Sequence, residues 1–182
     1  SARIPADSPY YAQSEEIGAL LAKAGFTTIA GGGPGIMEAA NKGAFEAGGT
    51  SIGLHIKLKT ESKANPYLSI NLPFQHFVSR KATFFMHSMA YIVLPGGFGT
   101  LDELFETLTW LQLGFHGKPV GLLNVAGFFD HLLTFLDHMS TTGFLKPEHR
   151  SSLSTETYPE SLLQAIRAFQ PYTCEKWIDE LR

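Results

Sequence analysis

Two glycine-rich segments have the composition of backbone sites that bind an anion. They are residues 31–35 (GGGPG) and residues 95–100 (PGGFGT). Each follows a short apolar segment and precedes a segment with helical periodicity. Glycine lets a phosphate approach backbone N–H groups without a Cβ atom in the way, and the start of a helix adds partial positive charge. Glycines also form tight corners between strands and helices, but two such turns at equivalent places favour one anionic ligand held from two sides.

Charged side chains close to the second turn could do chemistry or serve the fold. Thr100 and Glu103 have the spacing of a capping box, in which the glutamate bonds back to the first amide of a helix, and on spacing alone this role is favoured for Glu103. Arg80 and Lys81 interrupt an apolar segment, and the ordinary interpretation of such a charged pair is that it lies on the solvated face of a helix. An arginine near a glycine turn is also a natural partner for a phosphate or a carboxylate. The spacing does not decide between these roles.

Several common functional motifs are missing from the 182 residues. Neither glycine turn fits G-x-G-x-x-G, and no G-x-x-x-x-G-K-[ST] occurs, which argues against a dinucleotide dehydrogenase and a P-loop ATPase. The seven histidines form no metal-ligand spacing, and no G-x-S-x-G marks a serine nucleophile. No lysine stands in a recognisable pyridoxal context. We therefore expect no metal and no cofactor.

The composition limits the class of partner. The formal net charge is −3, which excludes a strongly basic nucleic-acid binder. No apolar stretch reaches the roughly 18 residues of a membrane span, so we expect neither nucleic acid nor a membrane as a partner. The single cysteine, Cys174, excludes an internal disulfide framework and suits a reducing compartment, so we expect a cytoplasmic protein.

The elements that must position these residues alternate between strand and helix. Apolar or β-branched runs predict strands at residues 26–30, 50–56, 67–72, 90–94 and 119–125. Helical spacing predicts helices at residues 10–23, 36–47, 77–89, 101–113, 128–139, 159–169 and 174–181. Loops are expected at residues 57–66 and around Lys146 and Pro147.

This alternation favours an α/β fold with a parallel sheet covered by helices on both faces, because its strands are continuously apolar. No linker or repeat divides the chain, so residues 1–182 are expected to form one domain. Such a fold usually begins with a strand, whereas residues 1–8 (SARIPADS) look like the loop that follows one. The sequence leaves open whether a first strand precedes this loop.

Residues 95–103 (PGGFGTLDE) match the P-G-G-x-G-T-x-x-E signature of the LOG ("Lonely Guy") family, the cytokinin riboside 5′-monophosphate phosphoribohydrolases long labelled possible lysine decarboxylases. Residues 31–38 (GGGPGIME) and the step Ser79–Arg80–Lys81 also resemble family motifs. The similarity runs from about Ala24 to Phe129 and continues more weakly to Phe169. The family's first strand, with its glycine-serine turn, has no counterpart before Ser1.

The resemblance implies a Rossmann-like, doubly wound fold and hydrolysis of the N-glycosidic bond of AMP or an N6-modified AMP. It implies Glu103 and Arg80 as the catalytic pair. It also implies a homodimer or larger homo-oligomer, and base specificity set around Met37, Met86, Phe98 and a partner subunit. The residues expected to bind phosphate or substrate are Gly33, Gly35, Met37, Lys81, Gly96, Gly97, Gly99 and Thr100.

Physical chemistry supports this assignment, because cleavage of an N-glycosidic bond builds positive charge on the ribose, which a fixed carboxylate stabilises. The alternative is a nucleotide-binding sensor without catalysis, which shares the glycine turns. The inherited label of a pyridoxal-dependent lysine decarboxylase is not expected to apply.

Overall fold

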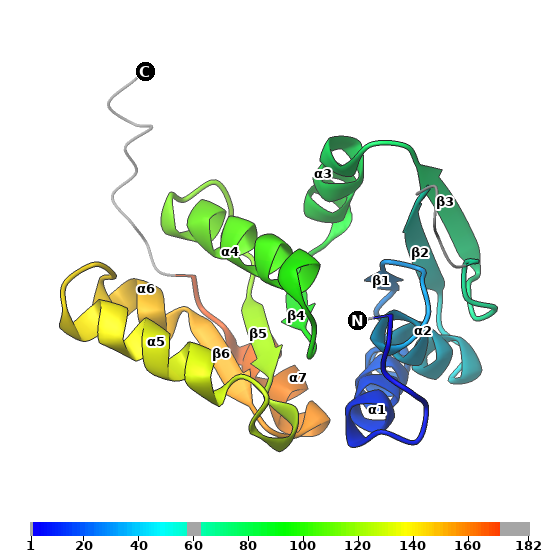
Figure 1. Ribbon diagram of the computed structural model, residues 1–182, viewed down its shortest axis with the longest axis horizontal. Helices are drawn as coiled ribbons and strands as arrows, with labels where there is room; N and C mark the ends of the chain where they lie inside the picture. The colour runs from blue at the N-terminus through cyan, green and yellow to red at the C-terminus, as the bar shows by residue number, and fades with distance from the viewer. Residues whose placement is uncertain (1, 58–62, 172–182) are drawn as a thin grey trace.

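The computed structural model describes residues 2–57 and 63–171, and its elements form two parallel sheets with helices around them (Figure 1). The predicted tail helix at residues 174–181, with Cys174, lies outside the described residues. The helices are α1 (Pro9–Lys23), α2 (Ile36–Glu46), α3 (Phe77–His87), α4 (Phe98–Gln112), α5 (Asp130–Thr141), α6 (Pro147–Ser151) and α7 (Pro159–Ala168), with a short 3₁₀ turn, η1 (Val125–Gly127). None of the described helices is both long enough and apolar enough to cross a membrane.

The first sheet has the strand order β1-β2-β3, and all its strands are parallel. Its strands are β1 (Thr28–Ala30), β2 (Ser51–Ile56) and β3 (Ile70–Phe74). Strand β3 begins three residues later than predicted, because the Tyr67 N–H donates to the Asn65 side chain and the chain joins the β2 edge only at Ser69. Pro73 is tolerated in β3 because this strand is an exposed edge.

The second sheet has the order β4-β5-β6 and is also parallel. Its strands are β4 (Tyr91–Val93), β5 (Val120–Leu123) and β6 (Leu153–Glu156). All four residues of β5 are buried, as expected for a central strand of this kind. Helix α6 and strand β6 were not predicted. Only Leu153 of β6 is buried, so this edge strand carries polar residues that hide its periodicity.

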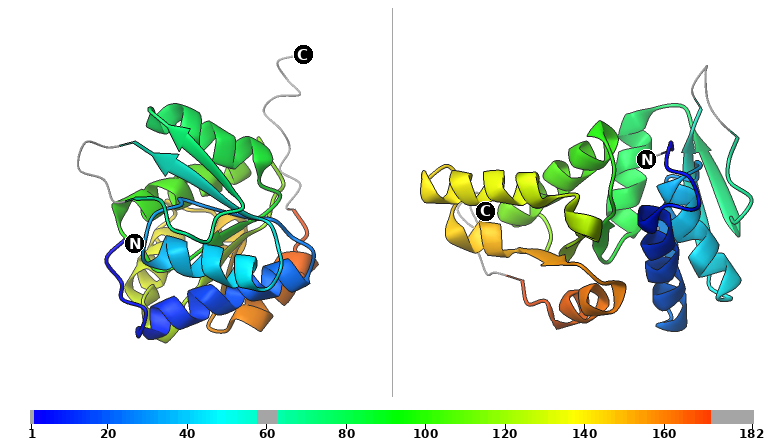
Figure 2. Two further views of the ribbon diagram at one scale, coloured as in Figure 1. Left: turned by 90° about the vertical axis from the view of Figure 1, so that its right-hand side faces the viewer. Right: turned by 60° about the horizontal axis from the view of Figure 1, so that its bottom comes forward.

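The apolar core explains how the helices cover the sheets. One buried cluster joins β4, β5 and β6 to α4 and α5. A second joins Ile17 of α1 to Leu123 of β5 and to Leu162 and Ile166 of α7. Helix α1 therefore touches both halves of the molecule. The α/β class with parallel sheets flanked by helices is confirmed, and Figure 2 shows α1 and α2 packed side by side beneath the first sheet.

Small residues allow α1 and α2 to approach closely. A Cβ atom on Gly43 of α2 would collide with the Glu15 carbonyl of α1, and one on Gly18 of α1 would collide with the Ala40 carbonyl of α2. Lys42 closes the same contact by pairing with Glu15, with Nζ 2.8 Å from Oε1. This packing fixes the direction in which α2 leaves the first glycine turn.

Candidate active site at the carboxyl edges of the sheets

The second glycine turn leads into α4, a helix whose N-terminus has no side-chain cap. Helix α4 begins at Phe98, where the Leu101 N–H donates to the Gly97 carbonyl at 3.1 Å, and no side chain caps it. Thr100 is therefore the third residue of the helix, so the predicted capping box is wrong. Phe98 and Gly99 extend the helix backward, which leaves the N–H groups of its first turn without intrahelical acceptors. Glu103 instead lines a groove of about 740 Å³ between the two sheets, which β1 and β4 also line.

The first glycine turn leads into α2 in the same way. Gly35 has a φ of 69°, a conformation that favours glycine, and it precedes α2 without a side-chain cap. Met37 packs over this turn, since a Cβ on Gly33 would lie 2.7 Å from its Cε atom. A Cβ on Gly31 would lie 2.8 Å from Nη2 of Arg80. Glycine is needed here so that Met37 and Arg80 can approach the backbone.

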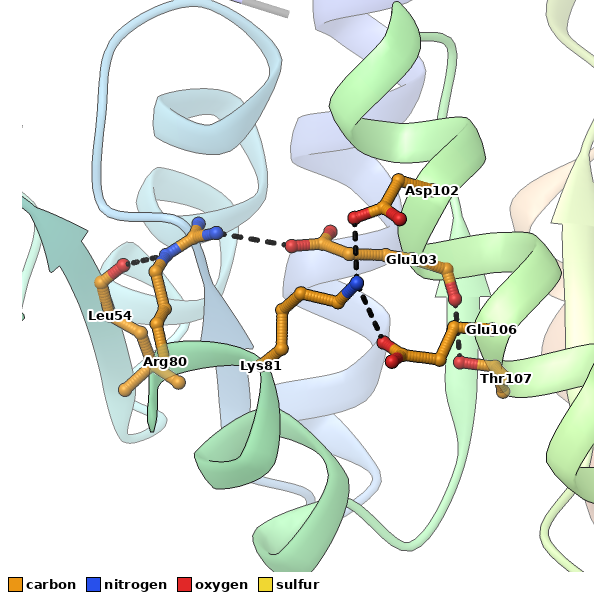
Figure 3. Close-up of polar contacts among 7 residues, drawn as sticks. All are labelled: Leu54, Arg80, Lys81, Asp102, Glu103, Glu106 and Thr107. Atoms are coloured by element: carbon orange, nitrogen blue, oxygen red, sulfur yellow. Dashed lines mark hydrogen bonds and ion pairs between the residues drawn. The ribbon is translucent and has the colours of Figure 1, made fainter. Parts of the chain in front are cut away.

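Arg80 and Glu103 meet beside these turns (Figure 3). Nε of Arg80 donates to the Leu54 carbonyl of β2 at 2.6 Å, and Nη1 donates to Oε1 of Glu103 at 3.1 Å. Arg80 is 9% exposed, and its guanidinium lies 5.0 Å from the centre of the Phe84 ring. The arginine is therefore an anchored, buried cation that orients the carboxylate.

The protonation of Glu103 depends on two opposing effects. Its side chain is 42% exposed, and the residue lines the groove between the two sheets. Burial raises the pKa of Glu103, while the Arg80 charge and hydrogen bond act to lower it. Burial is the larger effect, so Glu103 holds its proton to a higher pH than an ordinary glutamate does.

Lys81 points to the opposite side from Arg80 and bridges α3 to α4. Its Nζ atom lies 2.8 Å from Oδ2 of Asp102 and 3.0 Å from Oε2 of Glu106. The hydrogen bond to Asp102 is the largest cause of the raised pKa of Lys81. The Phe85 and Trp110 rings pack beside this bridge with centroids 3.9 Å apart. Lys81 therefore holds α3 against α4 in this structure.

The remaining glycines of the second turn divide into two kinds. A Cβ on Gly96 would collide with the Thr100 side chain, whereas a Cβ on Gly97 or Gly99 would meet nothing within 4 Å. Gly96 is thus explained by packing. Gly97 and Gly99 border open space beside the free N–H groups of α4, which is what close approach of a ligand requires.

A buried amide network that the sequence analysis missed supports the first turn. Nδ2 of Asn65 donates to the Gly33 carbonyl and to Oδ1 of Asn41, both at 3.1 Å, and the Asn65 N–H donates to the Gly32 carbonyl at 2.9 Å. Asn41 in turn donates to Ser51 at 2.8 Å. The sequence carries a signal for Asn41, because this polar residue interrupts a run of small residues on the buried face of α2. It carries no such signal for Asn65, which lies in an expected loop.

Comparisons with known proteins place the chain in a family. The model of the family described as possible lysine decarboxylase matches residues 37–166. A cytokinin riboside 5′-monophosphate phosphoribohydrolase of Arabidopsis thaliana, LOG5, is 38% identical over 143 residues, covering 78% of this chain and 62% of its own length. A probable enzyme of the same description from Oryza sativa subsp. japonica, LOGL3, is 37% identical over 84% of this chain and 73% of its own length. This chain belongs to the LOG family. It spans 62% of the length of the Arabidopsis LOG relative.

Solved structures resemble the LOG-family chain in fold alone. A molybdenum cofactor binding protein from Rippkaea orientalis has a TM-score of 0.69 at 23% identity and covers 91% of this chain and 90% of its own. A Moco carrier protein from Chlamydomonas reinhardtii has a TM-score of 0.65 at 22% identity and covers 92% of this chain and 90% of its own. Within residues 2–57 and 63–171, no group of three or more His, Cys, Asp or Glu residues could hold a metal ion.

Proposed function

We propose that this protein hydrolyses the N-glycosidic bond of a nucleoside 5′-monophosphate, AMP or an N6-modified AMP, to give the free base and ribose 5-phosphate. The observation that carries the proposal is the contact between Arg80 and Glu103 beside the uncapped start of α4. The activities for which the Arabidopsis and rice relatives are named belong to the same reaction class.

The two glycine turns supply the phosphate site in this proposal. The free N–H groups at the start of α4, next to Gly97 and Gly99, point donors and a partial positive charge toward an anion. The start of α2 after Gly35, which also has no side-chain cap, offers a second set of free N–H groups. A phosphate held there fixes the ribose, so binding energy remote from the reacting bond contributes to catalysis.

Glu103 serves the bond-breaking step. As the bond between C1′ and the base nitrogen breaks, the electron pair leaves with the base and positive charge develops on the ribose ring. The Glu103 carboxylate stabilises this charge, and it also orients the water whose oxygen bonds to C1′. The proton released by that water ends on the departing base. Arg80 opposes the rise in the pKa of this carboxyl group and holds it in place through the contact between Nη1 and Oε1.

A base-release assay tests this function. The protein is incubated with AMP, GMP, CMP and isopentenyl-AMP, and free base is measured by chromatography. Release from AMP or isopentenyl-AMP supports the proposal, and its absence at high protein concentration refutes it. Binding of AMP by calorimetry without base release would identify the alternative, a nucleotide-binding sensor. That alternative shares both glycine turns, so turnover is the discriminating measurement.

A lysine decarboxylase mechanism with pyridoxal phosphate fits these residues poorly. A Schiff base needs a neutral lysine amine, whereas Lys81 at the site is held as a cation between Asp102 and Glu106. We infer that the family label does not describe the reaction of this chain. An absorbance scan of the protein as purified checks this inference, because a bound pyridoxal would absorb near the edge of the visible range.

We also propose that the protein forms a homodimer through α3 and α4. Large apolar side chains on these helices are exposed, among them Val78 at 81%, Met86 at 78% and Phe98 at 93%. A patch of this kind marks an interaction surface in a water-exposed protein. Analytical ultracentrifugation of the wild type and of Val78→Glu measures the association. A dimer that the substitution weakens supports the proposal, and a wild-type monomer refutes it.

A further inference from the structure

Helix α3 carries Arg80 but contributes little to the apolar core. Arg80 is the one buried residue of this helix, which the structure describes throughout, whereas Val78 and Met86 are largely exposed. Phe84 and Phe85 are only half-buried. Apolar packing within this chain therefore fixes α3 weakly, and the polar contacts that hold the helix gain importance.

Side chains from the second sheet hold the carboxyl end of α3. The last four carbonyls of a helix have no N–H partner within the helix. The Phe85 carbonyl, one of these four, accepts from Nζ of Lys118 at 2.6 Å and from the Tyr91 hydroxyl at 3.2 Å. Tyr91 begins β4, and Lys118 lies two residues before β5. A cation at this position also opposes the partial negative charge at the end of the helix.

Within residues 2–57 and 63–171, Lys118 forms no ion pair with a carboxylate. Its Nζ atom lies 5.9 Å from the centre of the Phe85 ring and 5.8 Å from the centre of the Tyr91 ring, which is within range of a cation–π attraction. The contacts of this ammonium group are therefore directed to the end of α3.

His116 connects Lys118 to α4. The Lys118 N–H donates to Nδ1 of His116 at 3.1 Å, and Nε2 of the same ring lies 3.0 Å from the Thr107 carbonyl. Because Nδ1 accepts a hydrogen bond, the proton of the neutral ring is on Nε2, which donates to Thr107. Burial lowers the pKa of His116, which favours the neutral ring that both contacts require.

These contacts continue to the turn of α4 that carries Glu103. The Thr107 hydroxyl donates to the Glu103 carbonyl at 2.7 Å (Figure 3). A chain of hydrogen bonds therefore runs from this turn of α4, through His116 and Lys118, to the carboxyl end of α3. Arg80 lies about one and a half turns before that end, so a displacement of α3 would change its contact with Glu103.

We propose that Lys118, supported by His116, is a positioning residue that holds α3 where Arg80 contacts the carboxylate on α4. The Lys81 bridge to α4 acts nearer the amino end of α3, and this second connection acts at its carboxyl end. The inference that Lys118 thereby supports base release rests on the proposed function. Its effect on the contact between α3 and α4 does not.

The titration of Glu103 measures this effect without any activity. Its carboxyl signal is followed by ¹³C NMR and is identified by its absence in Glu103→Gln. Arg80 acts to lower this pKa, so Lys118→Met, which removes the donor but keeps an apolar side chain, should move the titration to higher pH. Lys146→Met removes the same charge from an exposed lysine before α6 and should leave the titration in place. An unchanged titration in Lys118→Met would overturn the proposal.

A double-mutant cycle separates positioning from a direct effect of the lysine charge. In an Arg80→Gln background, Lys118→Met should no longer move the Glu103 titration, because the contact through which it acts is already lost. An equal shift in both backgrounds would also overturn the proposal. If Lys118→Met does not fold, Tyr91→Phe takes its place in the cycle, with the same expected and contradicting results, because it removes the longer hydrogen bond at this end of α3.

Steady-state kinetics test the connection to the proposed reaction. The kcat of Lys118→Met should fall by roughly tenfold or more, because Arg80 and the carboxylate it orients are displaced. The KM for AMP should stay within roughly threefold of the wild type, because the proposed phosphate site at the start of α4 keeps its contacts. A change in KM alone would refute this connection. If no variant and no wild-type protein releases base, the proposed function fails, whereas the Glu103 titration still decides whether Lys118 positions α3.

Discussion

Arg80 and Glu103 join the two halves of the structure across the groove between the two sheets. Arg80 is anchored to the Leu54 carbonyl of β2 in the first sheet, and it reaches Glu103 of α4, which follows β4 in the second. The 3.1 Å contact between Nη1 and Oε1 therefore links the alignment of the two sheets to the orientation of the carboxylate. Because this one ion pair both aligns the sheets and orients the carboxylate, we expect substitution of either Arg80 or Glu103 to alter the proposed reaction.

Replacing the carboxylate should separate binding from turnover. Glu103→Gln keeps the size of the side chain but removes the charge that stabilises the ribose cation. We expect AMP affinity within a few-fold of the wild type and base release lower by about 10²-fold or more. Asp102→Asn is the matched control, since it removes a neighbouring carboxylate that points to Lys81. Equal turnover in Glu103→Gln and the wild type would remove Glu103 from the mechanism.

The pH dependence of base release should report the raised pKa of Glu103. The reaction needs the ionised carboxylate, so the rate falls as the pH falls through the pKa of this group. Because burial raises that pKa, the acid limb of kcat/KM should lie above the ordinary glutamate range. Arg80→Gln removes the effect that lowers the pKa, so the limb should move to higher pH in that variant. A limb at the ordinary glutamate value, or one unmoved by Arg80→Gln, contradicts this assignment.

The raised pKa of Glu103 also makes the free energy of unfolding depend on pH. The direction is opposite to that of a salt-bridged carboxylate, whose pKa is lowered in the folded protein. A folded-state pKa above the unfolded value means that the folded protein binds the proton more tightly. The stabilising contribution of Glu103 is therefore present at low pH and is lost as the pH rises through its folded pKa. Glu103→Gln should flatten this part of the stability profile in urea titrations, and a profile identical to that of the wild type would contradict the assignment.

The sequence predicts the alternation of elements well because most strands are short apolar runs between glycine turns. It predicts both turns and the candidates Arg80 and Glu103, but it cannot show that they touch, since 23 positions separate them and α3 must first pack on α4. It misjudges the start of α4, because Phe98 and Gly99 are poor signals of helix. It also misses β6, whose polar residues suit an exposed edge, and Asn65, which acts only through a long-range contact with the first turn.

The contact between α1 and α2 should tolerate no side chain at Gly43. Gly43→Ala places a methyl group against the Glu15 carbonyl, so one helix must move. We expect a loss of about 1–3 kcal/mol in the free energy of unfolding, measured in urea, although alanine favours helix over glycine. Ser161→Ala on the exposed side of α7 provides a helix substitution without such a collision. A Gly43→Ala protein as stable as the wild type would show that the helices are less closely packed.

Gly99 offers a test in which stability and binding should change in opposite directions. It lies inside the first turn of α4, and a Cβ there meets nothing within 4 Å, so Gly99→Ala should raise the free energy of unfolding by up to about 1 kcal/mol. The same methyl group would stand where we propose that a phosphate approaches the free N–H groups, so the KM for AMP should rise about tenfold or more. Urea unfolding and steady-state kinetics measure the two effects. A more stable protein with an unchanged KM would show that this glycine serves the fold and not the ligand.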